Sequence, residues 1–204
     1  MFTNIPQPVL DRMKHLEEQD RIDRQDGSDR FYRLRQIPPD SGRFLAVMAA
    51  AAPPGRVVEV GTSGGYSALW LTRACQQRGD QLTTLEIEPQ KIATARQTFA
   101  TAGIADLVEL IPGDALENLK TIDQIAFCFI DLEKELYKPV YDLVLPRLLP
   151  GAILCADNAI SHGEFMPEFM DAALNEPRLD ALIVPIGKGV LVGRMQGSKQ
   201  GNNP

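Results

Sequence analysis

Short apolar segments alternate with segments of helical spacing along most of this 204-residue chain. Five short runs with the character of strands occupy residues 57–60, 81–86, 108–111, 125–130 and 152–156, of which 125–130 is apolar throughout, and helical spacing is found at residues 9–20, 43–52, 67–78, 90–102, 137–149 and 164–176. Short runs that are apolar throughout are typical of strands buried on both faces. Their alternation with helices predicts an α/β fold built on a parallel sheet.

The C-terminal part of the pattern differs, because two short apolar runs, 182–185 and 190–192, follow each other without a helix. The glycines of residues 186–189 between them indicate a hairpin. We therefore expect a seven-stranded, mostly parallel sheet with an antiparallel last strand and helices on both faces. Residues 37–42, rich in proline and glycine, are expected to form a turn, residues 1–36 a helical N-terminal segment, and residues 196–204 a disordered tail.

The composition is that of one globular domain, with 44% hydrophobic and 24% charged residues. A net charge of −6 gives no general attraction to nucleic acid or to an anionic membrane. Neither a signal peptide nor an apolar stretch long enough to span a membrane is visible, so we expect a cytoplasmic protein. The cysteines at 75, 128 and 155 lie in apolar segments without CxxC spacing, which favours buried thiols over disulfides or a zinc site.

The first parallel strand runs into a glycine-rich turn, residues 61–65, and then into a helix. Such a turn can carry a cofactor, because glycine permits positive φ and close approach to the backbone. It is not a phosphate-binding loop, since Gly65 is followed by Tyr66 and Ser67 rather than by lysine and a hydroxyl residue. It also lacks the third glycine of the dinucleotide fingerprint.

Acidic and amide side chains stand at the ends of later strands. Glu86 ends the second strand and is our candidate for binding a ribose, with Glu88 as its rival. Asp131 ends the fourth strand, and Asp157 with Asn158 end the fifth, so the three reach the same edge of the sheet. Their oxygens suit Mg²⁺, Mn²⁺ or Ca²⁺ better than zinc. The alternative is that these acids cap helices or pair with an arginine such as Arg147.

The motif Val-x-Glu-x-Gly-x-x-x-Gly-Tyr-Ser at residues 57–67 resembles motif I of class I S-adenosylmethionine-dependent methyltransferases. Its Gly-Tyr-Ser ending, the segment 131–137 (Asp-x-x-Lys-x-x-Tyr) and the pair Asp157-Asn158 resemble the cation-dependent O-methyltransferases of the catechol and caffeoyl-CoA type. The resemblance covers residues 37–194 and implies a Rossmann-like methyltransferase fold. One departure is Leu132 and Glu133, where many caffeoyl-CoA-type members have Ala and Asp, and this puts the shape of the substrate pocket in doubt.

The resemblance also implies roles for individual residues. Glu59 would lie near the amino group of S-adenosylmethionine, Ser67 near its carboxylate, Glu86 at its ribose, and Asp114 or the Ala115 amide at its adenine. The full set of implied cofactor contacts is Ile37, Glu59, Gly61, Thr62, Ser63, Gly65, Ser67, Glu86, Gly113, Asp114, Ala115 and Asp131. The metal ligands would be Asp131, Asp157 and Asn158, and the catalytic residues Lys134, as the base, and Asp131.

We therefore expect a metal-assisted O-methyltransferase acting on a catechol-like or other small chelating substrate. Two alternatives stay open, a methyltransferase for hydroxylated uridine in tRNA and a noncatalytic protein that binds S-adenosylmethionine. Family members include dimers and monomers, so a homodimer is possible. Arg30, Arg33 and Arg35 could meet an anionic substrate or a partner subunit, although solvated or ion-paired arginines are commoner.

Overall fold

The computed structural model describes residues 2–25, 27 and 33–197. In this part of the chain seven strands form one sheet in the order β3-β2-β1-β4-β5-β7-β6. All neighbouring strands are parallel except that β7 is antiparallel to both β5 and β6. The expected seven-stranded sheet with an antiparallel last strand is confirmed. The strands are β1 (Arg56–Val60), β2 (Leu82–Glu86), β3 (Val108–Pro112), β4 (Ile125–Ile130), β5 (Leu148–Ala156), β6 (Leu179–Val184) and β7 (Val190–Met195).

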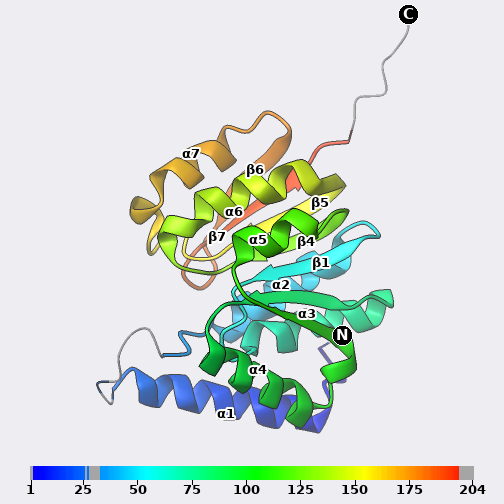
Figure 1. Ribbon diagram of the computed structural model, residues 1–204, viewed down its shortest axis with the longest axis vertical. Helices are drawn as coiled ribbons and strands as arrows, with labels where there is room; N and C mark the ends of the chain where they lie inside the picture. Colours follow the sequence, from blue (N-terminus) through cyan, green and yellow to red (C-terminus); the bar gives the residue numbers. More distant parts are fainter. Residues whose placement is uncertain (1, 26, 28–32, 198–204) are drawn as a thin grey trace, which may run out of the picture.

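Helices cover both faces of the sheet (Figure 1). On one side lie α2, α3 and α4, with α1 outside them against α3 and α4; on the other lie α5, α6 and α7. The helices are α1 (Gln7–Asp23), α2 (Pro39–Ala51), α3 (Tyr66–Arg78), α4 (Pro89–Ala102), α5 (Ala115–Asn118), α6 (Tyr137–Val144) and α7 (Pro167–Leu174).

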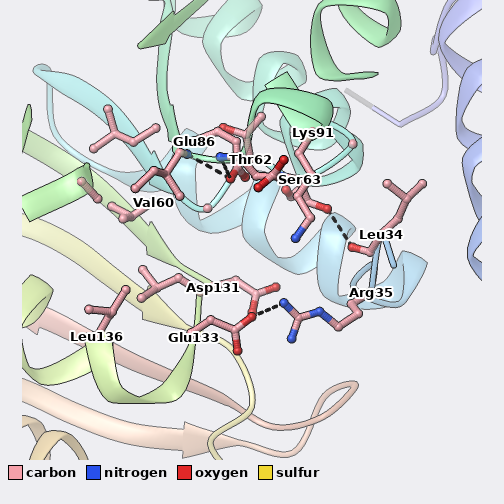
Figure 2. Close-up of a pocket in the computed structure, with 18 of the residues that line it drawn as sticks. Leu34, Arg35, Val60, Thr62, Ser63, Glu86, Lys91, Asp131, Glu133 and Leu136 are labelled. Atoms are coloured by element: carbon pink, nitrogen blue, oxygen red, sulfur yellow. Dashed lines mark hydrogen bonds and ion pairs between the residues drawn. The ribbon is translucent and has the colours of Figure 1, made fainter. Parts of the chain in front are cut away.

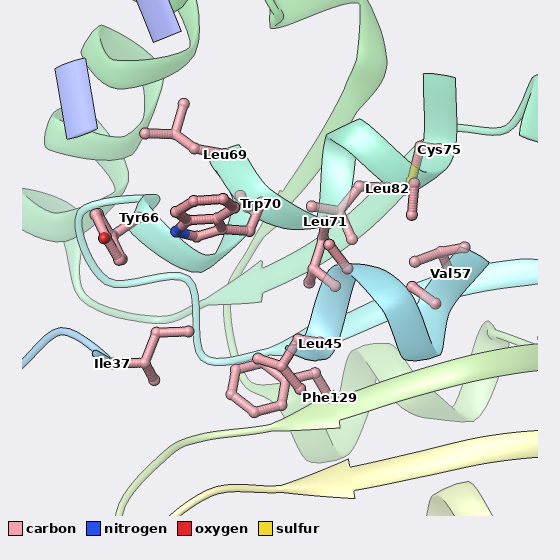
Figure 3. Close-up of a cluster of buried hydrophobic side chains, with 14 of the residues drawn as sticks. Ile37, Leu45, Val57, Tyr66, Leu69, Trp70, Leu71, Cys75, Leu82 and Phe129 are labelled. Atoms are coloured by element: carbon pink, nitrogen blue, oxygen red, sulfur yellow. The ribbon is translucent and has the colours of Figure 1, made fainter. Parts of the chain in front are cut away.

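The central strands carry apolar side chains on both faces, and each face has its own core. Val57 and Phe129 belong to the core under α2 and α3, whereas Val58 and Ile130 belong to the core under α6 and α7. Figure 3 shows the first of these cores. There α2 packs so closely on α3 that a Cβ at Gly42 would collide with the indole of Trp70. All three cysteines are buried free thiols, as expected.

Several predicted boundaries were wrong, and proline explains two of them. Residues 39–42 are not a turn: α2 begins at Pro39, where proline fits the first helical position because its missing N–H needs no partner there. The predicted helix 137–149 ends at Val144, and a short 3₁₀ turn (Leu145–Arg147) leads into β5 at Leu148. Pro150 and Gly151 lie inside that strand, at an irregularity where pairing jumps from Ile125–Leu148 to Phe127–Ile153.

At its C-terminal end the ordered chain reaches into the segment expected to be disordered. Gln196 donates a backbone hydrogen bond to the Arg178 carbonyl (2.8 Å) and a side-chain bond to Asp180 (2.9 Å). Residues 198–204 of the predicted tail lie outside the described residues. Among the helices that are described, none has the length and apolar character to cross a membrane.

Candidate functional site

One cavity of about 400 Å³ opens at the carboxyl ends of β1, β2 and β4 (Figure 2). Ligands of open α/β sheets bind at this edge, where the chain leaves the parallel strands in loops. Most of the predicted site residues line this cavity: Ile37, Gly61, Thr62, Ser63, Ser67, Glu86, Gly113, Asp114, Ala115, Asp131, Lys134 and Asn158. Glu59, Gly65 and Asp157 are not part of its lining.

The glycine-rich turn is shaped by contacts within the protein. Gly61 has φ of +103°, and a Cβ there would collide with the carbonyl oxygen of Asp131. Gly65, at the start of α3, has φ of +84°, and a Cβ would lie 2.8 Å from the ring of Phe99. The third residue of the turn with positive φ is Ser63 (φ +47°) rather than Gly64, although glycine would permit it there. The turn therefore holds β1 against the end of β4.

Glu59 is fully buried beneath this turn and does not reach the cavity. The hydroxyl of Thr84 donates to its Oε2 (2.6 Å) and also contacts the Thr62 hydroxyl (2.5 Å). Its Oε1 has no hydrogen-bond partner within the described residues. Burial raises the pKa of Glu59 to about 7, against the opposing effect of the Ser67 and Thr84 hydroxyls. Glu59 thus lies beneath the turn, whereas Thr62 and Ser63 of the turn and Ser67 of α3 line the cavity.

Glu86 is held in one orientation by backbone donors. Its Oε2 accepts from Ser63 N (2.8 Å), and its Oε1 accepts from Ile87 N and Glu88 N (3.0 Å each). Each carboxylate oxygen has two lone pairs, so Oε1 is fully used by its two backbone donors and Oε2 can still accept from a ligand hydroxyl. The rival Glu88 caps α4 by accepting from Gln90 N (3.3 Å). This difference favours Glu86 as the ligand-binding acid.

The turn after β3 closes the cavity next to Glu86. Gly113 donates its N–H to the Glu86 carbonyl oxygen (2.8 Å), which fixes this turn to the end of β2. Asp114 caps the short helix α5 by accepting from Leu116 N (2.8 Å). The helix was not expected from the sequence, since four residues are too few to show periodicity. Asp114 and Ala115 both line the cavity, so the choice between them as adenine contact stays open.

Asp131, Asp157 and Asn158 meet at the ends of β4 and β5. Asn158 donates from Nδ2 to Asp131 Oδ1 (3.1 Å) and has φ of +66°. Asp157 is fully buried, and neither of its carboxylate oxygens has a hydrogen-bond partner within the described residues. Arg147, considered as a partner for these acids, instead pairs with Asp123 (3.5 Å).

Charge is concentrated at this meeting point. Burial raises the pKa of Asp131, an effect that the positive charges of Lys134, Lys188 and Arg35 oppose. Burial, together with the charge of Asp131, raises the pKa of Asp157 to about 7. Two neighbouring acids without a proton or a cation between them are unfavourable at neutral pH, so this corner of the cavity favours a positively charged ligand.

Lys134 and Tyr137 stand beside the acids. The Lys134 ammonium donates to the Leu132 carbonyl (3.1 Å) and to the Tyr137 hydroxyl (3.3 Å), and it lies 4.7 Å from the centre of the Tyr137 ring. The Tyr137 hydroxyl lies within hydrogen-bond distance of Asp131 Oδ1 (3.5 Å) and of the Asp157 carbonyl (3.3 Å), either of which can accept its one proton. Burial lowers the pKa of Lys134, while Asp131 and Asp157 act in the opposite direction. Tyr137 therefore links the base candidate to the acids, a role that the sequence motif alone did not reveal.

The segment that leads into α2 roofs the cavity. Leu34 accepts a hydrogen bond from the Ser63 hydroxyl at its carbonyl oxygen (2.8 Å), and Ile37 lines the cavity. Arg35, with φ of +48°, reaches across to form an ion pair with Glu133 (Figure 2). Arg35 is thus ion-paired, the commoner of the outcomes considered for the N-terminal arginines. Arg33 also lines the cavity, and Arg30 lies outside the described residues.

A model of the O-methyltransferase family matches residues 16–195 of this chain. The chain belongs to this family. The catechol O-methyltransferase of Mycobacterium tuberculosis H37Rv is 36% identical over 138 residues, which are 67% of this chain and 62% of that protein. The chain thus matches less than two thirds of this curated relative's length.

Solved members of the family share the fold. The crystal structure of cofactor-bound Rv0187 from MTB has a TM-score of 0.77 and 26% identity, and covers 94% of this chain and 91% of its own. The O-methyltransferase TomG from Streptomyces achromogenes, solved in complex with SAM, has a TM-score of 0.73 and 26% identity over 89% of each chain. The expected methyltransferase fold is confirmed.

Proposed function

We propose that this protein is an S-adenosylmethionine-dependent O-methyltransferase that methylates one hydroxyl of a catechol-like diol with the help of a divalent cation. The observation that carries the proposal is that one cavity is lined both by the glycine-rich turn with Glu86 and by Asp131, Asn158 and Lys134. Methyl donor and acceptor must meet within a few ångströms for a displacement at the methyl group. A shared cavity meets that requirement.

The relatives support the same assignment. The Mycobacterium tuberculosis relative is named a catechol O-methyltransferase, and TomG was crystallised with S-adenosylmethionine. The chemical groups in our cavity agree with this cofactor. Glu86 offers a carboxylate oxygen for a ribose hydroxyl, Ser67 offers a hydroxyl donor for the methionine carboxylate, and Ile37 provides an apolar wall.

The residues at the acidic corner fit a divalent cation. Asp157 is buried with both carboxylate oxygens unpartnered among the described residues, a costly arrangement unless a cation or a proton joins it. Asp131 and Asp157 would hold the ion together with Asn158, whose amide would have to turn, because it now presents Nδ2 to Asp131. Among the described residues, no group of three His, Cys, Asp or Glu side chains is arranged to hold a metal ion, so in this proposal an amide completes the set. Hard oxygen donors favour Mg²⁺, Mn²⁺ or Ca²⁺.

The chemistry requires that a weakly acidic hydroxyl lose its proton. A phenol has a pKa of about 10, and a bound divalent ion supplies positive charge that favours its ionised form. Lys134 is the base in this proposal, because burial lowers its pKa and its ammonium lies beside Tyr137 and the acids. Tyr137 and Leu132 orient Lys134, while the turn at Gly61 keeps the donor aligned with the acceptor.

The test is methyl transfer from labelled S-adenosylmethionine to catechol and, in parallel, to bulk tRNA, in chelator and again after addition of Mg²⁺. We expect methylated catechol only when the metal is present. Transfer to tRNA instead of catechol would favour the tRNA alternative. Binding of the cofactor without transfer to either acceptor, with metal supplied, would support the noncatalytic alternative.

Neither alternative has a specific observation in its favour. A net charge of −6 does not suit an enzyme that must hold tRNA, and Lys134 and Asp131 line the cavity as a catalytic role would require. A homodimer and a cytoplasmic location stay predictions, which light scattering and cell fractionation would decide.

A further inference from the structure

Three cations surround the acidic corner of the cavity. Lys134 follows β4, Arg35 comes from the segment before α2, and Lys188 comes from the tip of the β6–β7 hairpin. Each is close enough for its charge to act on Asp131. We call the part of the cavity on this side the acceptor side. It is lined by Asp131, Lys134, Leu136, Asn158, His162 and Lys188.

Two of these cations are already engaged by the protein. Arg35 forms its ion pair with Glu133, and Lys134 donates to Leu132 and Tyr137. The ammonium of Lys188 has no hydrogen bond or ion pair with any residue that the structure describes. It is half-buried and borders the cavity, which is an unusual place for a cation without a partner.

The backbone holds Lys188 firmly at this place. Its carbonyl oxygen accepts from Ile160 N (3.1 Å) and Ser161 N (3.0 Å), which fixes the hairpin tip to the loop just after Asn158. The hairpin tip is closely packed on this loop, since a Cβ at Gly189 would collide with Ile160. The lysine is therefore presented from a rigid support, as a residue that selects a ligand group must be.

The charges of the acceptor side leave Lys188 in excess once the proposed ion is present. The carboxylates of Asp131 and Asp157 balance a divalent cation, and Glu133 balances Arg35. Lys134, as the proposed base, must be uncharged to accept a proton. We infer that Lys188 binds an anionic substituent, a carboxylate, on the diol that the enzyme methylates, and so determines its specificity. The inference rests on the proposed function. The competing explanation is that Lys188 only offsets the charge of Asp131 and Asp157.

The experiment compares two acceptors of the same shape, 3,4-dihydroxybenzoate and its uncharged methyl ester. Calorimetry with S-adenosylhomocysteine and Mg²⁺ present gives the affinity of each acceptor, and initial rates with S-adenosylmethionine give kcat/KM. The proteins are the wild type, Lys188→Gln, Lys188→Arg and, as a matched control, Lys120→Gln, which removes a lysine outside the cavity that pairs with Glu117.

We expect the wild type to bind and to methylate the benzoate about tenfold better than the ester, as one charge-assisted contact at a half-buried site would give. Lys188→Gln should remove this preference by weakening the benzoate alone, Lys188→Arg should keep it, and Lys120→Gln should change neither acceptor.

If Lys188→Gln lowers affinity and kcat/KM equally for both acceptors, the inference is overturned in favour of the charge-offsetting explanation. If neither quantity changes for either acceptor, Lys188 has no role in the site. A wild type that binds both acceptors alike also refutes it. If the wild type methylates neither these two compounds nor catechol, the proposed function fails, and the calorimetric preference still shows whether Lys188 binds a carboxylate.

Discussion

Replacing Glu59 with glutamine should stabilise the ligand-free protein, increasingly so as the pH rises. Glu59 is fully buried, one of its oxygens has no partner among the described residues, and its pKa is raised from an ordinary value of 4.5 to about 7. Below pH 4.5 the carboxyl group is protonated in both the folded and unfolded states and contributes no penalty. Between pH 4.5 and 7 the unfolded chain releases this proton while the folded protein retains it, so stability is lost progressively, and above 7 the folded protein buries the charge and carries the full penalty.

The raised pKa of Glu59, about 7 against 4.5, sets the size of this loss at about 3 kcal/mol, because each pH unit corresponds to about 1.4 kcal/mol. Glutamine keeps the shape and can still accept the hydrogen bond from Thr84. The free energy of unfolding of Glu59→Gln minus that of the wild type should therefore rise by about 2–3 kcal/mol between pH 5 and pH 8.

Urea unfolding without cofactor or metal at pH 5, 6, 7 and 8 measures this difference. The matched control is Glu109→Gln, because Glu109 is an exposed carboxylate that also accepts a hydrogen bond from a threonine, Thr83 (3.2 Å). Its difference from the wild type should stay within about 0.5 kcal/mol at every pH. A Glu59→Gln difference that does not change with pH would refute the argument that burial of this charge destabilises the fold.

Three further predictions concern the site. Glu86→Ala should weaken S-adenosylmethionine binding by about 1–3 kcal/mol in calorimetry. Glu88→Ala should leave binding intact and lower the free energy of unfolding by about 0.5–2 kcal/mol through loss of the helix cap. The reverse pattern would mean that Glu88 binds the ribose. Asp157→Ala should abolish Mg²⁺-dependent methyl transfer and leave cofactor affinity unchanged, and activity that persists in chelator would contradict this. Gly61→Ala should lower the free energy of unfolding in urea by more than about 3 kcal/mol, but Gly79→Ala by only about 1 kcal/mol. Gly79 is the control because it also has positive φ, while nothing lies within 4 Å of its Cβ position. Equal losses would show that crowding by Asp131 is unimportant.

The sheet could be predicted because its strands are short, apolar and separated by helices. The starts of individual helices and strands were harder to predict, because proline can begin a helix or lie inside a strand as well as end an element. Pro39 starts α2, and Pro150 lies within an irregular stretch of β5, but both look like breakers in the sequence. Pairing with β4 decides where β5 begins, and no local pattern encodes that pairing.

The acids of the site could be found in the sequence because strands running in one direction end at one edge. Asp131 and Asp157 therefore had to be neighbours if the strand assignment was correct. Two of the cations around these acids, Lys188 and Arg35, come from segments whose position the alternation of strands and helices does not predict. In the sequence, Lys188 is recognisable only as part of a glycine-rich turn, so its position beside the site is not visible there. The contact between Arg35 and Glu133 joins residues that are 98 positions apart. Such contacts follow from packing, which the sequence pattern alone does not specify.

The buried acids of the site lower the stability of the ligand-free protein. Glu59, Asp131 and Asp157 are all held where burial raises their pKa, and the carboxylate oxygens of Asp157 have no hydrogen-bond partner among the described residues. A fold selected only for stability would replace them with apolar side chains. A cationic ligand supplies the positive charge that these buried carboxylates lack, so its binding removes the destabilisation and is correspondingly more favourable. A sulfonium cofactor and a divalent cation are both positively charged, so a site with surplus buried acids should gain stability from each of them.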